Sequence, residues 1–165
     1  MPNQTCKVPI NGRPPGIEPA TGVVSSTDKA RTADVVSASR QPKIMMVDDE
    51  KLNSFVVAEY LKSGGYRDLV QTDDPLQVLS LAQRVRPDVI LLDIHMRGLD
   101  GLAVLRQIRA DKALCRTPVV IVTASTDEAM KSQALELGAT DFLHKPIRKE
   151  KILDCVRNIL LAQVD

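Results

Sequence analysis

The regular recurrence of short apolar runs constrains this chain more than any other feature of its sequence. From Pro42 onward, five such runs are separated by longer mixed stretches. Runs without polar alternation predict strands that are buried on both faces, which is typical of a parallel sheet. The runs lie at residues 44–47, 69–70, 89–92, 119–122 and, more weakly, 142–143.

Helical periodicity follows each of these runs. Residues 52–62 place Leu52, Phe55, Val56, Glu59 and Tyr60 at helical spacing, and similar patterns occupy residues 75–86, 102–109, 127–137 and 149–162. Alternating strands and helices fold as a parallel sheet with helices on both faces, joined by right-handed crossovers. The expected fold class is therefore α/β, a doubly wound five-stranded parallel sheet with five helices.

Local signals mark where two of these helices begin and end. Asp74 precedes Pro75, and Gln77 follows at the position of a capping-box partner, so a helix is expected to begin here. Gly138 follows the fourth helical pattern and is expected to end it.

Residues 1–41 differ in composition from the remainder. They contain five of the ten prolines and no Leu, Phe or Tyr. Such a segment buries too little apolar surface to offset the entropy lost on ordering. We therefore expect a flexible, disordered N-terminal arm at 1–41 and one folded domain at 42–165.

Charge and cysteine content exclude several classes of protein. The net charge of +1 and the absence of massed Lys and Arg argue against direct nucleic-acid binding. The sequence has neither an apolar run of the roughly 18 residues that span a membrane nor a secretory signal. Cys6, Cys115 and Cys155 are too scattered for a zinc site or a disulfide framework. A cytoplasmic protein is the simplest interpretation.

Polar residues occur where the predicted strands end. Asp48 and Asp49 follow the first strand, Asp93 ends the third, Thr123 ends the fourth and Lys145 follows the fifth. Ligands of open parallel sheets bind at the carboxyl ends of the strands. We therefore expect these five side chains to meet in one crevice.

Three carboxylates in one crevice need a cation. Two like charges 4 Å apart repel by about 4 kcal/mol at an effective dielectric near 20. Magnesium suits carboxylate and carbonyl oxygens and keeps water positions open for a phosphate. A carboxylate can accept a phosphoryl group. In the transition state of that transfer, negative charge spreads over three phosphoryl oxygens, of which the metal could bind one, Lys145 another and the Thr123 hydroxyl the third. Asp93 is the expected acceptor.

Residues 43–162 resemble the receiver domain of bacterial-type response regulators in two-component signal transduction. The likeness covers the domain from end to end. It rests on residues 47–50 (VDDE), 91–94 (LLDI), 99–101 (LDG), 122–124 (VTA) and 138–146 (GATDFLHKP). It implies the flavodoxin-like strand order 2-1-3-4-5.

The resemblance also implies a role for each site residue. Asp93 matches the phosphorylated aspartate, and Lys145 matches the lysine that contacts the phosphoryl group. Asp49 matches a direct Mg2+ ligand, Asp48 its neighbour that acts largely through water, and His95 the position whose backbone carbonyl binds the metal.

Three further expectations come from the same likeness. Thr123 matches the switch hydroxyl, Phe142 the aromatic residue that moves inward with it, and the Lys145–Pro146 bond is expected to be cis. Two departures are visible. Arg97 stands where the family usually has proline and is expected to contact a partner, while His95 and Ser125 occupy positions that tune hydrolysis of the acyl phosphate.

The implied function is a phosphorelay switch rather than an enzyme in the usual sense, since the domain assists only its own phosphorylation and dephosphorylation. A histidine kinase or histidine phosphotransfer protein would supply the phosphoryl group. The surface of the fourth helix, fifth strand and fifth helix would then engage an output protein, a missing output domain or a second copy of the chain.

Two alternatives remain open on sequence grounds. A degenerate receiver would act as a phosphate-independent interaction module, although all key positions are intact. A phosphatase with an aspartate nucleophile would need a second acid two residues on, where this chain has His95. Some polar residues are expected to be inert: His144 as an exposed neighbour of Lys145, and the charges of residues 106–116 as a solvated face.

Overall fold

The computed structural model describes residues 40–164. The expected N-terminal arm lies outside the described residues, apart from Arg40 and Gln41. The strands are β1 (Lys43–Val47), β2 (Asp68–Thr72), β3 (Val89–Asp93), β4 (Val119–Thr123) and β5 (Asp141–His144). The helices are α1 (Lys51–Ser63), the 3-10 helix η1 (Pro75–Gln77), α2 (Val78–Val85), α3 (Gly101–Ala110), α4 (Glu128–Glu136) and α5 (Lys149–Ala162).

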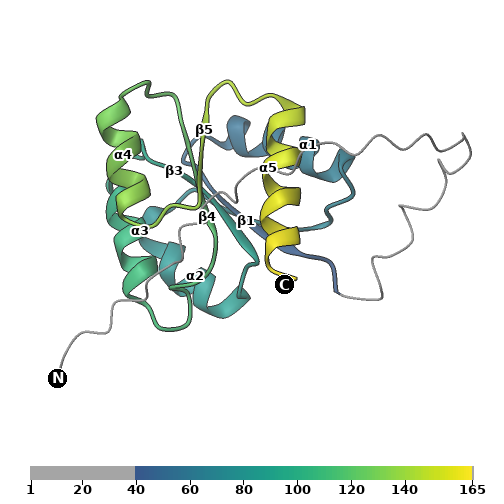
Figure 1. Cartoon of the computed structure of the whole chain (residues 1–165), viewed down its shortest axis with the longest axis horizontal. Coiled ribbons are helices and arrows are strands. Elements are labelled where there is room, and N and C mark those ends of the chain that lie inside the picture. Colours follow the sequence, from purple (N-terminus) through teal and green to yellow (C-terminus); the bar gives the residue numbers. More distant parts are fainter. Residues whose placement is uncertain (1–39, 165) are drawn as a thin grey trace, which may run out of the picture. The chain divides into compact units, whose positions relative to one another are not determined.

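The five strands form one parallel sheet in the order β2-β1-β3-β4-β5, which confirms the expected fold. Helices α1 and α5 cover one face of this sheet, and α2, α3 and α4 cover the other (Figure 1). The order reverses after β1, so the carboxyl ends of β1 and β3 lie side by side. That is the switch point at which ligands of open α/β sheets bind.

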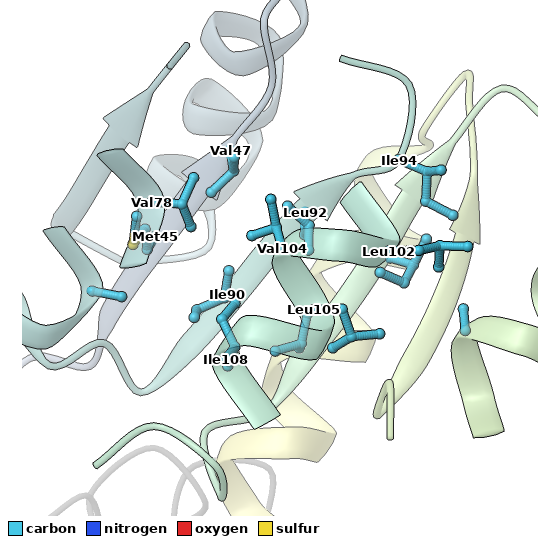
Figure 2. Packing of buried hydrophobic residues seen from close by; sticks show 14 of the residues in the cluster. Met45, Val47, Val78, Ile90, Leu92, Ile94, Leu102, Val104, Leu105 and Ile108 are labelled. Atoms are coloured by element: carbon cyan, nitrogen blue, oxygen red, sulfur yellow. The ribbon is translucent and has the colours of Figure 1, made fainter. Parts of the chain in front are cut away.

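Alternate residues of each central strand enter opposite cores. Met45 and Ile90 join the core beneath α2 and α3, whereas Met46 and Leu91 join the core beneath α1 and α5. Figure 2 shows Ile90 and other strand residues packed with Ile108 and its neighbours on α3. Burial on both faces explains why the apolar runs of β1, β3 and β4 lack polar alternation, since helices cover both sides of these strands.

The apolar spacing expected in the first helix does not mark its buried face. Helix α1 buries Ser54, Val57, Ala58 and Leu61. The residues that led to the prediction include Leu52 and Phe55, whose exposed fractions are 74% and 58%. The prediction of a helix is confirmed, but the residues whose spacing led to it do not form the buried face. This helix carries two stripes of apolar residues with similar spacing, and only the position of the sheet determines which of them is buried.

The second helix differs slightly from its prediction. Its first turn, Pro75–Gln77, is a 3-10 helix, and the α-helix begins at Val78. The Asp74 side chain accepts the Leu76 N–H, as expected for an N-cap, and the Gln77 amide donates to the same carboxylate at 2.8 Å.

Residues 106–116 are only in part the solvated face that the sequence suggested. Arg109 donates to the Thr117 carbonyl and, through Nε and Nη2, to the Gly138 carbonyl, and so links α3 to the end of α4. Asp111 accepts the backbone N–H groups of Ala113 and Leu114. Both charges hold backbone groups in place, which charge patterning alone does not reveal.

Within residues 40–164, the structure contains no helix that is both long enough and apolar enough to cross a membrane.

Candidate functional site

Three carboxylates converge at the switch point of the sheet. Asp48 and Asp49 directly follow β1, and Asp93 is the last residue of β3. These strands are paired, with Val47 opposite Leu92, so their ends bring the acids together. One oxygen from each acid lies within 4.8 Å of the others. Asp48 and Asp93 are buried, and Asp49 is partly buried at the rim.

Lys145 supplies the first positive charge. Its Nζ lies 2.8 Å from Asp48 Oδ2 and 2.8 Å from Asp93 Oδ2, and so bridges the two buried acids. The Lys145 N–H donates to the Thr123 carbonyl at 2.8 Å, and the Lys145–Pro146 bond is cis, as expected. Burial alone would lower the pKa of Lys145, but hydrogen bonds and charge from the two acids outweigh it. The net effect raises the pKa of Lys145, so the amine is charged at neutral pH.

Backbone donors orient the buried carboxylates. The His95 N–H donates to Asp93 Oδ1 at 3.1 Å, and the Glu50 N–H donates to Asp48 Oδ1 at 2.8 Å. Each acid therefore offers one oxygen to the backbone and the other to Lys145. These contacts fix the orientation of both carboxylates.

Arg97 supplies the second positive charge. Its backbone N–H and its Nε both donate to Asp49 Oδ2, at 2.9 and 3.2 Å. The backbone hydrogen bond from Arg97 is the largest of the causes that lower the pKa of Asp49, although burial of the carboxylate opposes the shift. From the sequence, Arg97 was expected to contact a partner. Its contact with Asp49 was not predicted, because the sequence shows that Arg97 lies in a loop but does not show which carboxylate lies next to that loop.

Thr123 and Phe142 lie on the next two strands of the sheet, β4 and β5. Thr123 is fully buried, and its Oγ1 accepts the Ser125 N–H at 3.2 Å. Phe142 is half-buried and pairs with Ile121 across β4 and β5. The ring of Phe142 meets the ring of His144 edge to face, with centroids 5.0 Å apart.

His144 is exposed, as expected, but it is not free of contacts. Its Nδ1 lies 3.0 Å from the Ser125 carbonyl oxygen, so the end of β5 is tied to the loop after β4. The sequence gave no signal for this contact, because it depends on β4 and β5 pairing in register.

Gly101 allows α3 to begin directly against the end of β3. A Cβ on residue 101 would overlap the Asp93 carbonyl oxygen and would lie 2.6 Å from Ile94 Cα. The helix can therefore begin this close to β3 only because residue 101 has no side chain. The sequence suggested a structural turn at Asp100–Gly101, and Asp100 does cap α3 by accepting the Leu102 N–H.

The donor set of this cluster fits a divalent cation. Carboxylate oxygens are hard ligands of the kind that Mg2+ prefers. The three acids carry one more negative charge than Lys145 and Arg97 neutralise, so a cation is favoured there. Asp48, Asp49 and Asp93 are the side chains that could hold it.

Comparison with known proteins agrees with this geometry. A family described as the response regulator receiver domain matches residues 44–157. The response regulator PleD of Caulobacter vibrioides is 37% identical over 117 residues, which are 71% of this chain and 26% of PleD. Protein PilH of Pseudomonas aeruginosa is 31% identical over 72% of this chain and 97% of its own length. The chain therefore spans about a quarter of one such relative and nearly all of another.

A solved structure extends the likeness to three dimensions. The receiver domain of the sensor histidine kinase PA1611 from Pseudomonas aeruginosa has 30% identity and a TM-score of 0.66, over 72% of this chain and 97% of that chain. That structure has a magnesium ion coordinated in its active-site cleft. With the family match covering more than half of its length, this chain belongs to the response-regulator receiver domains of two-component signalling.

Proposed function

We propose that this protein is a phosphoacceptor switch in which Asp93 receives a phosphoryl group. The observation that carries the proposal is the Lys145 ammonium, which lies 2.8 Å from both Asp48 Oδ2 and Asp93 Oδ2 in an acid cluster at the switch point. The Lys145 ammonium is a charged hydrogen-bond donor. Because it contacts one oxygen of Asp93, it lies close to where the oxygens of a phosphoryl group on Asp93 would be.

In the proposed reaction, an Asp93 carboxylate oxygen forms a bond to phosphorus while the bond to the donor nitrogen breaks. Lys145 then turns from the Asp93 carboxylate to the transferred phosphoryl group, whose charge replaces that of the carboxylate. The Asp48 carboxylate keeps the ammonium in place during this exchange. Bound Mg2+, held by Asp48, Asp49, Asp93 and the His95 carbonyl, would supply additional neutralisation of phosphoryl charge. The magnesium in the PA1611 receiver supports this choice of metal.

Thr123 is the proposed link from phosphorylation to the surface. Its hydroxyl is buried and accepts a single N–H in the present state, from Ser125. When the phosphoryl group arrives, the Thr123 hydroxyl donates to it, and Phe142 occupies the space that Thr123 leaves. This rearrangement changes the surface of α4, β5 and α5, so that a change of charge at Asp93 alters a surface distant from it.

The exposed stripe of α1 is the surface proposed for the phosphodonor. Helix α1 begins directly after the acid loop, and it exposes Leu52, Phe55 and Val56. Exposed apolar patches of this kind mark protein interaction sites. A histidine kinase or histidine phosphotransfer protein docked here would bring its phosphohistidine to Asp93. Because such donors take their phosphoryl group from ATP, the proposed location of the protein is the cytoplasm.

The surface of α4, β5 and α5 is the proposed output face. Helix α4 exposes Leu135 and α5 exposes Leu161, on the elements that flank β5. An output protein, an output domain of a longer chain or a second copy of this chain would bind there after phosphorylation.

Incubation with acetyl phosphate and Mg2+, followed by intact mass spectrometry, tests the acceptor. The parent protein is expected to gain one phosphoryl group and Asp93→Asn none. Asp100→Asn is the matched control, because Asn is as good an N-cap as Asp and should preserve labelling. Equal labelling of Asp93→Asn and the parent would refute the proposal.

Phosphotransfer from a kinase tests the docking surface separately. Phe55→Ala is expected to slow labelling by a phosphorylated kinase or phosphotransfer protein about tenfold, while acetyl phosphate labels it normally. Leu161→Ala, which removes an equally exposed side chain from α5, should be labelled by both donors at the parent rate. Loss of labelling by acetyl phosphate in Phe55→Ala would point to damage of the site rather than of docking.

A further inference from the structure

Arg97 holds an unusual position at the mouth of the acid cluster. About nine-tenths of its side chain is exposed, yet its Nε reaches Asp49 Oδ2, and the Asp49 side chain is only 13% exposed. The backbone N–H of the same residue donates to the same oxygen. A proline here would supply neither donor, because it has no N–H and no charged group. The side-chain contact therefore depends on the arginine, whereas the backbone contact needs only a residue other than proline.

The two cations of the site divide the three acids between them. Lys145 binds Asp48 and Asp93, and Arg97 binds Asp49. Lys145 is largely buried and held by two carboxylates, so it is a fixed part of the site. The Arg97 guanidinium is held to one carboxylate by a single side-chain hydrogen bond and is otherwise in water. Moving it away from Asp49 therefore costs little free energy.

We infer that Arg97 is a built-in counter-ion of the metal site, which neutralises Asp49 in the metal-free protein and lowers the affinity of the cluster for a divalent cation. The inference rests on the proposed function for the identity of that cation, Mg2+. A guanidinium beside Asp49 repels an incoming divalent ion and must give up its hydrogen bond when Asp49 turns to the metal. Arg97 thereby holds the Asp49 side chain in place when no metal is bound, and it favours dissociation of a bound metal ion.

Electrostatics sets the size and the salt dependence of this effect. A unit charge several ångströms from a divalent ion, in a setting close to bulk water, changes affinity by about three- to tenfold. Because Arg97 is exposed, the effect is screened by salt and shrinks as ionic strength rises. A purely structural role for Arg97 would give no such salt dependence.

Calorimetric titration of the metal-free protein with Mg2+ tests the inference without any phosphorylation. Arg97→Ala keeps the backbone N–H donor and deletes the charge, so it is expected to bind Mg2+ about three- to tenfold more tightly at low salt. In molar salt, its affinity should converge with that of the parent. Arg97→Lys keeps the charge and should stay within about twofold of the parent. Arg106→Ala removes an exposed arginine from α3 and controls for net charge.

The guanidinium can also be observed directly. In nitrogen-15 NMR spectra, the Arg97 Nε–H signal is expected to move on addition of Mg2+, while the Arg106 signal stays in place. Unchanged or weaker Mg2+ binding by Arg97→Ala at low salt would overturn the inference, as would a stationary Arg97 signal in a protein that binds Mg2+. Neither result would disturb the proposed phosphorylation of Asp93, which the mass measurement tests separately. If neither the parent nor Arg97→Ala binds Mg2+, the inference is also overturned.

Discussion

Helices α3 and α4 follow neighbouring strands and contribute to the same core, but they are held very differently. Helix α3 buries five residues, Gly101, Leu102, Val104, Leu105 and Ile108. Helix α4 buries only Ala134, with Met130 partly buried against the same core. The strand before α3 carries Asp93, and the strand before α4 carries Thr123.

In the proposed function, this difference would separate a part of the molecule that stays fixed from a part that moves. An acceptor carboxylate needs a rigid support to face Lys145 and the other acids, and α3 provides it with a full apolar face. A switch needs an element whose packing can be changed by a few kcal/mol. Helix α4 meets that condition because little apolar surface is lost when it shifts.

Truncation of one side chain on each helix should show the contrast most strongly. Ile108→Ala, at a fully buried position of α3, is expected to lower the free energy of unfolding by about 2–5 kcal/mol. Leu135→Ala, at a position of α4 that is 45% exposed, should lower it by less than about 1 kcal/mol. Urea denaturation measures both. Similar losses for the two variants would remove the distinction between the helices.

Gly101→Ala tests how closely α3 packs on the end of β3, where the proposed acceptor Asp93 lies. The added Cβ meets backbone atoms of Asp93 and Ile94, which cannot move aside as a side chain can. A loss of about 1–3 kcal/mol of stability is expected, together with slower labelling of Asp93. Gly65→Ala is the control, because that position has a φ of +94° and open space around it, so only backbone strain is added. Labelling by acetyl phosphate should be normal in Gly65→Ala.

The pH dependence of stability tests the packing of β5 against α5. Burial, then the charge of Asp141, raises the pKa of the Cys155 thiol to about 12, and its Sγ donates to Asp141 Oδ2 at 3.2 Å. The folded-state pKa lies above the unfolded value near 8.5, so the stabilisation is complete below pH 8.5 and is lost as pH rises towards 12.

Cys155→Ala provides the reference for that measurement. Between pH 8 and pH 10, the parent is expected to lose about 1–2 kcal/mol more stability than Cys155→Ala does. Parallel curves for the two proteins would mean that the thiol is less buried in solution than the structure has it.

The smallest structural change should have a purely functional readout. Thr123→Ser keeps the hydroxyl and should cost about 1 kcal/mol or less, whereas Thr123→Ala removes the group that the proposed switch needs. With beryllofluoride as a phosphoryl mimic, NMR shift changes in α4 and β5 should persist in Thr123→Ser and disappear in Thr123→Ala. Changes in α3 as large as those in α4 would contradict the division between a fixed and a mobile helix.

Much of the fold and the main members of the site could be predicted from the sequence. Continuous apolar runs such as residues 89–92 predict strands buried on both faces, because they are short, rich in β-branched residues or leucine, and alternate with helical patterns. Once the strands are known, the rule that ligands bind at their carboxyl ends brings Asp48, Asp93 and Lys145 together. The roles of Thr123, Phe142 and His95 came from resemblance and remain predictions.

The features that could not be predicted are those for which the local sequence allows two outcomes equally well. The stripe containing Leu52 and Phe55 looks as suitable for the core as the stripe containing Val57 and Leu61, and only the packing of α1 on the sheet buries the second. Arg109 looks like a surface charge until α3 is placed beside the end of α4, where it binds the Gly138 carbonyl.

The sequence by itself determined the order of strands and helices, the parallel sheet and the set of polar residues at its carboxyl edge, because periodicity and burial are properties of short segments. The tertiary structure alone decided which face of α1 meets water, which cation binds which acid and how firmly each helix is held. Those outcomes depend on distances between segments far apart in the chain, and no local pattern encodes such distances.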